Sequence, residues 1–212
     1  MSDEIPLILF AKAPIAGKVK TRLTTHCTEQ QAADIAELLM EASIQRACDA
    51  WPGKVYLSVW LDYSHSFFNK MLQSYPVLMI HQCEGDLGEK MREALDSQGY
   101  PAAVMGCDVP HVSVQSLEAA HDSLVQGKSV IGPALDGGYY LLGLTEPADV
   151  LFLDKQWGQG SVLSDTLTSA NASGLSLHEL KAINDVDEWS DLLEAANQVP
   201  SLHGYLQAQK LI

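Results

Sequence analysis

Strand-sized apolar runs alternate with amphipathic segments along this chain, and the alternation limits its fold more than any other feature. The first run, Ile5–Phe10, has the length and composition of a buried strand. Residues 28–50 carry apolar side chains at helical spacing, and Thr28 with Gln31 is the signature of a capping box. The alternation predicts an α/β fold with a mainly parallel, twisted sheet and helices on both faces.

Further elements continue this alternation to the end of the chain. We expect strands over residues 54–61, 77–81, 102–107, 129–133, 139–144 and 175–180, and helices over 64–74, 86–97, 113–126, 160–172 and 187–198. Asp86 with Glu89, and Ser113, are the expected caps of two of these helices. A chain of 212 residues suits one core, so we expect a single domain over residues 1–212.

The charge balance excludes several classes of partner. The formal net charge of −14 argues against nucleic acid, because phosphate backbones repel such a surface. The apolar runs are too short for a membrane span, and the acidic start Met1–Glu4 is unlike a secretory signal. Four scattered cysteines without a Cys-x-x-Cys pair fit free thiols. We therefore expect a cytoplasmic protein without a membrane partner.

Positive charge gathers in one place, directly after the first expected strand. Lys12, Lys18, Lys20 and Arg22 lie within eleven positions around Gly17. A loop with free backbone N–H groups and several cations at the carboxyl end of a strand suits phosphate oxygens. Simple solvation of a surface loop is the alternative. The location at a strand end favours phosphate binding.

Two aspartates are candidate ligands for a divalent metal ion. Asp108 follows the apolar run 102–107, so it faces the same crevice as the cationic loop, where Mg²⁺ or Mn²⁺ can bridge carboxylates to phosphates. A capping role is the alternative, although Ser113 is better placed for it. Asp187 is the better second ligand, and capping of the late helix is equally compatible with it. Whether Asp185 faces the metal instead is left open.

A glycine-rich stretch between two expected strands carries a third aspartate. Asp136 can orient or deprotonate an acceptor, and Gly137 with Gly138 lets a ligand approach the backbone. The same residues favour a plain hairpin turn, and the two interpretations are compatible. Trp157 is a candidate for the wall of an acceptor pocket, with core packing as the alternative.

Five blocks of the sequence resemble a bacterial family with the GT-A, nucleotide-diphospho-sugar transferase fold. Its members are largely of unknown function and are often labelled glycosyltransferase-like. More distantly, the blocks are similar to molybdenum-cofactor guanylyltransferase and phospholactate guanylyltransferase. They occur in family order across almost the whole chain and are Lys12–Leu23, Gly85–Met91, Gly106–Pro110, Gly132–Gly143 and Asp185–Leu192.

The resemblance implies a set of ligand contacts. Asp108 would hold the divalent metal. The implied nucleotide contacts are Lys12, Gly17, Lys20 and Arg22 for the phosphates, and Gly85, Asp86 and Gly88 for the base or ribose. The chain departs from the family pattern at several positions: Lys18 and Lys90 replace arginines, Glu188–Trp189 replaces Thr-Pro, and Asp108 has no Asp-x-Asp partner.

These observations predict a Mg²⁺- or Mn²⁺-dependent transferase that uses a nucleotide-linked donor and a small-molecule acceptor. Lys12, Lys20, Arg22 and the metal would stabilise charge on the departing phosphates. Glycosyl transfer from a nucleotide sugar and nucleotidyl transfer from a nucleoside triphosphate both fit. The dense cations favour the triphosphate and the family label favours the sugar donor, which puts glycosyl transfer slightly ahead. A nucleotide-binding protein without catalysis is the third reading.

Overall fold

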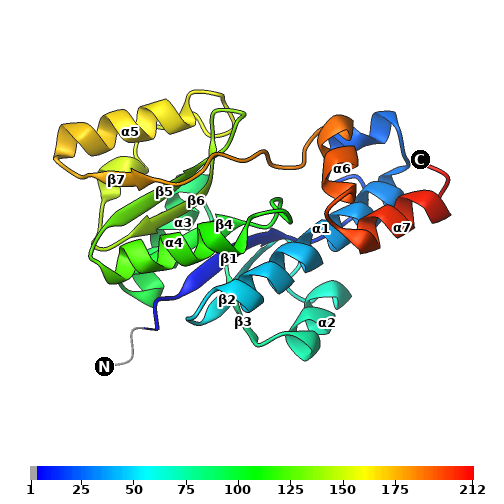
Figure 1. The fold of residues 1–212 in the computed structure, drawn as a ribbon, viewed down its shortest axis with the longest axis horizontal. Helices are drawn as coiled ribbons and strands as arrows, with labels where there is room; N and C mark the ends of the chain where they lie inside the picture. Colours follow the sequence, from blue (N-terminus) through cyan, green and yellow to red (C-terminus); the bar gives the residue numbers. More distant parts are fainter. Residues whose placement is uncertain (1–3) are drawn as a thin grey trace.

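A seven-stranded sheet runs through the computed structural model, which describes residues 4–212 (Figure 1). Its strands are β1 (Leu7–Lys12), β2 (Val55–Trp60), β3 (Val77–His81), β4 (Ala102–Gly106), β5 (Ser129–Pro133), β6 (Tyr139–Leu144) and β7 (Leu177–Glu179). The order is β3-β2-β1-β4-β6-β5-β7, and of these seven strands only β6 is antiparallel to its neighbours. The predicted α/β fold with a mainly parallel sheet is confirmed.

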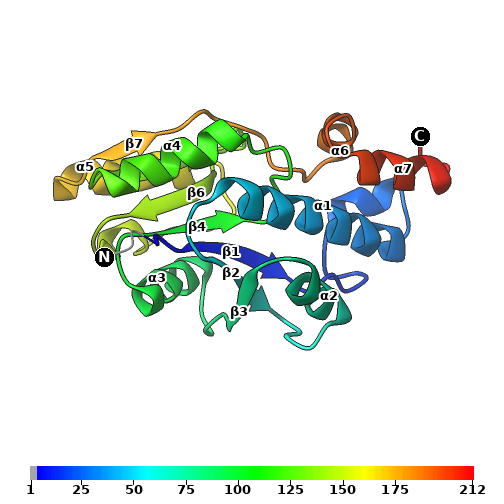
Figure 2. The same ribbon diagram turned by 60° about the horizontal axis from the view of Figure 1, so that its bottom comes forward.

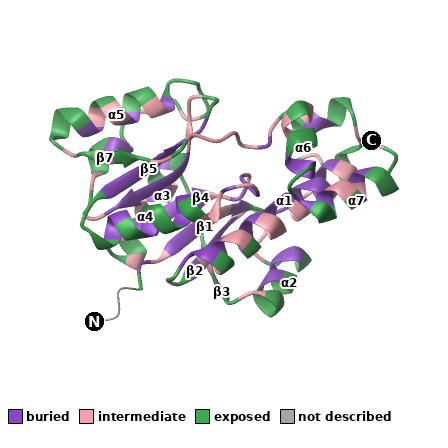
Figure 3. Cartoon of the chain, in the orientation of Figure 1, coloured by how far each residue is buried: buried purple, intermediate pink, exposed green. Residues whose placement is uncertain are grey.

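Helices cover both faces of the sheet, as Figure 2 shows for α1 and α4 on one side and α3 on the other. The first face packs against α1 (Glu29–Ala50), α2 (Ser66–Ser74) and α4 (Val114–Val125), and the second against α3 (Leu87–Gln98) and α5 (Val162–Ser173). Residues alternate along β1: Leu7 and Leu9 belong to the first apolar cluster, Ile8 and Phe10 to the second. The central strand is therefore buried on both sides (Figure 3).

Three helices begin where the sequence predicts them, because side chains satisfy their first backbone N–H groups. Thr28 and Gln31 exchange hydrogen bonds of 2.9 and 3.2 Å. Asp86 and Glu89 exchange two of 2.9 Å. Ser113 accepts a hydrogen bond of 3.0 Å from the third residue of its helix. These caps fix the loops that precede each helix.

A third apolar cluster lies at one end of the molecule, away from the sheet (Figure 1). It joins the first half of α1 to the 3-10 helix η1 (Thr21–Thr25), to α6 (Trp189–Ala196) and to α7 (Pro200–Ala208). Neither η1 nor α7 is among the elements predicted from the sequence. Pro200 occupies the first turn of α7, a position that suits proline and starts a separate helix.

The observed strand β1 is displaced by two residues from its predicted bounds. It ends at Lys12, so this lysine belongs to the strand and not to the loop that follows. The predicted strand 175–180 is shorter, at three residues. Among residues 4–212, no helix has the length and apolar character that a membrane crossing needs.

The third cluster yields a test with a matched control. Leu192 of α6 is fully buried, whereas its neighbour Leu193 is 38 % exposed. We expect Leu192→Ala to lower the free energy of unfolding by about 2–5 kcal/mol, since it opens a cavity, and Leu193→Ala to cost less than about 1 kcal/mol. Urea denaturation measures both variants. Equal losses would contradict the packing of α6.

Candidate functional site

A cavity of about 340 Å³ opens where β1 and β4 end at the same edge of the sheet. The loop after β1 forms one wall, the first residues after β4 form the floor, and the segment before α6 closes the other side. Six of the predicted site residues line this cavity together: Lys12, Lys18, Lys20, Arg22, Asp108 and Asp187. The juxtaposition expected of the cationic loop and the aspartate after β4 is therefore present.

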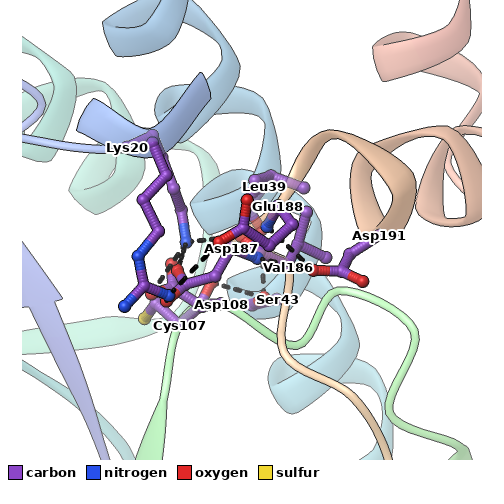
Figure 4. A network of polar contacts seen from close by, with 10 residues as sticks. Lys20, Leu39, Ser43, Cys107, Asp108, Val186, Asp187, Glu188 and Asp191 are labelled. Atoms are coloured by element: carbon purple, nitrogen blue, oxygen red, sulfur yellow. Dashed lines mark hydrogen bonds and ion pairs between the residues drawn. The ribbon is translucent and has the colours of Figure 1, made fainter. Parts of the chain in front are cut away.

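Lys20 is the centre of the polar network in Figure 4. Its ammonium lies 3.1 Å from Asp108 Oδ2 and 3.1 Å from Asp187 Oδ1, and it donates a 2.7 Å hydrogen bond to the Val186 carbonyl. The side chain is only 5 % exposed. Burial by itself lowers the pKa of Lys20, but the attraction of Asp108 and Asp187 outweighs it and the pKa is raised. Lys20 is therefore a buried cation with two anionic partners.

The backbone of Lys20 is left-handed, with φ 45° and ψ 39°. This conformation costs a non-glycine residue about 1–2 kcal/mol. Leu23, fully buried in the third apolar cluster one turn later, anchors η1 behind it. The loop is therefore held in an unfavourable backbone conformation by packing on one side and by ion pairs on the other.

Two buried contacts that the sequence analysis missed hold the segment after β4. The Ser43 hydroxyl of α1 donates a 2.8 Å hydrogen bond to the Cys107 carbonyl. The Val186 N–H donates to the Asp108 carbonyl at 3.1 Å. Asp108 is thus fixed from both sides, and its carboxylate is left to face the cavity. A serine inside an otherwise apolar helical stripe is the one sequence signal for the first contact.

The segment before α6 explains which late aspartate faces the cavity. Asp191 Oδ2 accepts from the backbone N–H of Glu188 at 2.8 Å and of Asp187 at 3.3 Å, and Glu188 is the N-cap residue of α6. The alternative that Asp187 caps the helix is therefore wrong. Its carboxylate instead contacts Lys20 and, at 3.2 Å, Arg22 Nη1.

Asp108 and Asp187 are suited to share a divalent cation with a ligand. Both approach the same ammonium group, and their side chains are 49 % and 40 % exposed. Across residues 4–212, no group of three or more His, Cys, Asp or Glu side chains is placed to hold a metal ion. Mg²⁺ bound with phosphates commonly takes one or two protein carboxylates and keeps several waters. The pair fits that mode and does not form an all-protein cage.

The predicted acceptor residues meet in a second cavity of about 220 Å³, which shares Phe10 with the first. Asp136, Gly138 and Trp157 line it. Gly138 N–H donates to Asp136 Oδ1 at 2.8 Å, and a Cβ at Gly137 would collide with the Gly160 carbonyl. The predicted hairpin between β5 and β6 is confirmed, and the turn also forms part of a cavity wall.

The remaining predicted glycines lie outside the lining of both cavities. Gly17, with φ +73°, turns the cationic loop beside Glu29. Gly85 and Asp86 form the start of α3, and Gly88 is buried beneath the Trp157 indole, where a Cβ has no room. Contact of this turn with a base or ribose stays a prediction.

Asp185 is a fourth carboxylate near the site. Its side chain is half-buried; burial, together with the negative charges of Asp187 and Asp136, raises its pKa to about 6. The sequence pattern alone could not decide which of Asp185 and Asp187 faces the cavity, since both lie in the short segment before the late helix.

Replacing the buried cation tests the network. Lys20→Met keeps much of the side-chain volume but leaves Asp108, Asp187 and the Val186 carbonyl without their shared donor. We expect the free energy of unfolding to fall by about 1–3 kcal/mol. Lys18→Met, in the same loop but exposed, should change it by less than about 0.5 kcal/mol. Chemical denaturation at pH 7 compares the two, and equal effects would exclude a structural role for the Lys20 ion pairs.

Asp185 predicts a pH dependence of stability in metal-free protein. A folded pKa of about 6, above the unfolded value, means that its favourable contribution is present at low pH and is lost as the pH rises through 6. Asp185→Asn should therefore gain stability relative to wild type between pH 4.5 and 7.5, by about 1 kcal/mol after solvent screening. Glu118→Gln on the exposed surface of α4 is the control. A gain that is independent of pH would contradict the raised pKa.

The fold occurs in several solved structures. A Desulfovibrio desulfuricans protein, provisionally named a nucleotide-diphospho-sugar transferase, is 25% identical over 99% of this chain and 96% of its own, with a TM-score of 0.85. A 4-diphosphocytidyl-2C-methyl-D-erythritol synthase from Anaerococcus prevotii is 10% identical over 93% and 97%, with a TM-score of 0.62. A Mycobacterium tuberculosis protein in complex with manganese is 15% identical over 92% and 100%, with a TM-score of 0.54.

Comparison of the sequence itself with known proteins and families matches only part of the chain. No curated protein matches the chain. Residues 43–159, more than half of the chain, match the model of a family described as uncharacterized protein conserved in bacteria, DUF2064. The matched region contains β4, Asp108 and the turn at Asp136. The chain belongs to the DUF2064 family.

Proposed function

We propose that this protein is a divalent-metal-dependent nucleotidyltransferase, which uses a nucleoside triphosphate and a phosphorylated small molecule and releases pyrophosphate. The observation that carries the proposal is the cavity at the ends of β1 and β4, whose lining includes four cations and two carboxylates. In a chain with a net charge of −14, this is a local concentration of positive charge.

The charge of the cavity favours a triphosphate over the diphosphate of a sugar nucleotide. Among the residues that line the cavity, Lys12, Lys18, Lys20 and Arg22 exceed Asp108 and Asp187 by two positive charges, and outside the lining Glu188 lies 3.7 Å from Arg22. A divalent cation on the carboxylates would add two more. A nucleoside triphosphate carries one more phosphate than a sugar nucleotide. Its additional negative charge would be balanced by this positive excess, with the cations of the loop after β1 as partners.

The reaction needs little covalent chemistry from the protein. An oxygen of the acceptor phosphate attacks the α-phosphorus, and the bond from that phosphorus to the bridging oxygen of the β-phosphate breaks. Lys20 and Arg22 stabilise the charge that accumulates on the leaving pyrophosphate. Asp108 and Asp187 would hold the cation, whose chemistry when bound is neutralisation of phosphate charge. The chain contributes position and electrostatics, with no covalent intermediate.

The similar structures are compatible with this reaction. The Anaerococcus prevotii protein is named for the synthesis of a diphosphocytidyl compound, and the Mycobacterium tuberculosis protein is a manganese complex. At 10% and 15% identity they support the analogy through the fold. The proposal reverses the slight preference for glycosyl transfer drawn from the sequence.

Glycosyl transfer is the second candidate, and the provisional name of the Desulfovibrio desulfuricans protein favours it. In that reaction Asp136, on the rim of the second cavity, would orient or deprotonate an acceptor hydroxyl. The non-catalytic alternative rested on the altered motif at Glu188–Trp189. Because Glu188 serves as the N-cap of α6 and Asp187 still reaches Lys20, that alteration leaves the cavity intact.

Calorimetric titration separates the candidates. With Mg²⁺ present, at least one of the four ribonucleoside triphosphates should bind at least tenfold more tightly than UDP-glucose or GDP-mannose, and EDTA should abolish the difference. Asp108→Asn should remove the Mg²⁺-dependent part of the affinity, since it removes one of two anionic ligands. Asp122→Asn, an exposed carboxylate on α4, is the control. Tighter binding of a sugar nucleotide would favour glycosyl transfer.

A further inference from the structure

We propose that the second cavity is the acceptor subsite, and that it selects a phosphorylated compound with a small, uncharged, apolar body over sugar phosphates. The inference rests on the nucleotidyltransferase proposed above and adds the chemical class of its acceptor. Its basis is the composition of the cavity, its open floor and its junction with the cationic cavity.

The walls of the second cavity are apolar and come from four parts of the chain. They include Phe10 from β1, Met91 from α3, Tyr139 from β6, and Trp157 with Val162 around the start of α5. No Lys, Arg or His belongs to this lining, all of which lies in the described part of the chain. Asp136 is the carboxylate at the rim. An anionic group therefore has no cationic partner inside the cavity.

Three polar side-chain groups of the lining are open to a hydroxyl: the Asp136 carboxylate, the Gln159 amide and the Trp157 indole N–H, which has no hydrogen-bond partner among residues 4–212. The Tyr140 hydroxyl is already bonded to the Lys181 carbonyl at 3.3 Å, and the Tyr139 hydroxyl contacts Met91 Sδ at 3.8 Å. A sugar ring would bring more hydroxyls into this space than these few groups can bond, and the remaining hydroxyls lose water without a replacement. A nucleobase has the same difficulty, because its edge carries several donors and acceptors. An apolar ring or a short branched chain gives up no hydrogen bonds to water when it enters the cavity.

The floor of the cavity is open backbone. Gly106 pairs with Phe10 across β4 and β1, and alternation along β4 puts it on the same face as Val104, in the second apolar cluster. A Cβ built on Gly106 meets no atom within 4 Å. On the opposite side, the absence of a side chain at Gly88 lets the Trp157 indole lie against α3. Two glycines thus create a space that side chains would fill.

The size and the junction define the ligand. A volume of about 220 Å³ corresponds to the liquid volume of about seven waters, enough for one six-membered ring or a five-carbon branched chain. Phe10 lines both cavities, and Gly106 is two residues from Asp108. A compound whose body occupies the second cavity therefore carries its phosphate toward the cations and the donor.

The test uses phenyl phosphate, glucose 6-phosphate and inorganic pyrophosphate as calorimetric probes of the full chain with Mg²⁺. We expect phenyl phosphate to bind at least tenfold more tightly than glucose 6-phosphate. Gly106→Val should weaken phenyl phosphate at least tenfold and leave pyrophosphate, which occupies the cationic cavity, unchanged. Gly204→Val is the matched control, since Gly204 also has open space around it but lies on α7.

Three outcomes overturn the inference. Equal affinity for the two organic phosphates would show that the cavity does not select an apolar body. Unchanged phenyl phosphate binding in Gly106→Val would place that ligand elsewhere. If Gly106→Val weakens the nucleoside triphosphate, the cavity holds the nucleobase. Gly106→Ala, whose Cβ has free space, replaces the valine variant if that one does not fold.

Failure of the proposed function gives a different result. In that case wild-type protein with Mg²⁺ binds a sugar nucleotide more tightly than any nucleoside triphosphate, or binds no nucleoside triphosphate at all. The relative affinity for phenyl phosphate and glucose 6-phosphate still reports whether the second cavity selects an apolar body. Failure of the proposed function and failure of this inference are therefore distinguishable.

Discussion

The buried ammonium of Lys20 is the interaction on which the rest of the site depends. A cation that is only 5 % exposed is tolerated when anionic partners and carbonyls surround it, and here they come from two distant segments. Asp108 follows the strand β4, and Asp187 precedes α6. Burying Lys20 therefore requires the loop after β1, the end of β4 and the C-terminal helices to meet. The cavity is therefore complete only when these three segments pack together.

This network also determines how a charged ligand enters. Lys20 and Arg22 already have carboxylate partners at 3.1 and 3.2 Å, so phosphates would exchange partners with them and not simply add charge. Arg22 is 64 % exposed and is the easier of the two to redirect, while Lys20 is fixed by burial. Lys20 therefore holds the two carboxylates in position beside the phosphate charge that it stabilises, and Arg22 is the cation of the two that a phosphate can redirect.

Local sequence signals predicted the elements and their caps well, because each depends on a few neighbouring residues. The side chain of Thr28 decides the start of α1 without help from the rest of the fold. Local sequence signals failed where the conformation of a residue depends on contacts with distant parts of the chain. Which late aspartate faces Lys20 follows from the contact of Asp191 with Glu188, and the apolar cavity follows from the register of Phe10 against Gly106. Neither pairing can be seen before the strands are ordered.

Features that weaken a fold gather at one edge of this sheet. Lys20 adopts a left-handed backbone, Gly106 ends a central strand without a side chain, and the Trp157 indole nitrogen is buried without a hydrogen-bond partner. Each of these features costs the folded state free energy. Their coincidence at the carboxyl ends of β1 and β4, where open α/β sheets bind ligands, is what a site maintained for function would produce. The two adjoining cavities are therefore best understood as halves of one site, with Phe10 between the cationic cavity and the apolar one.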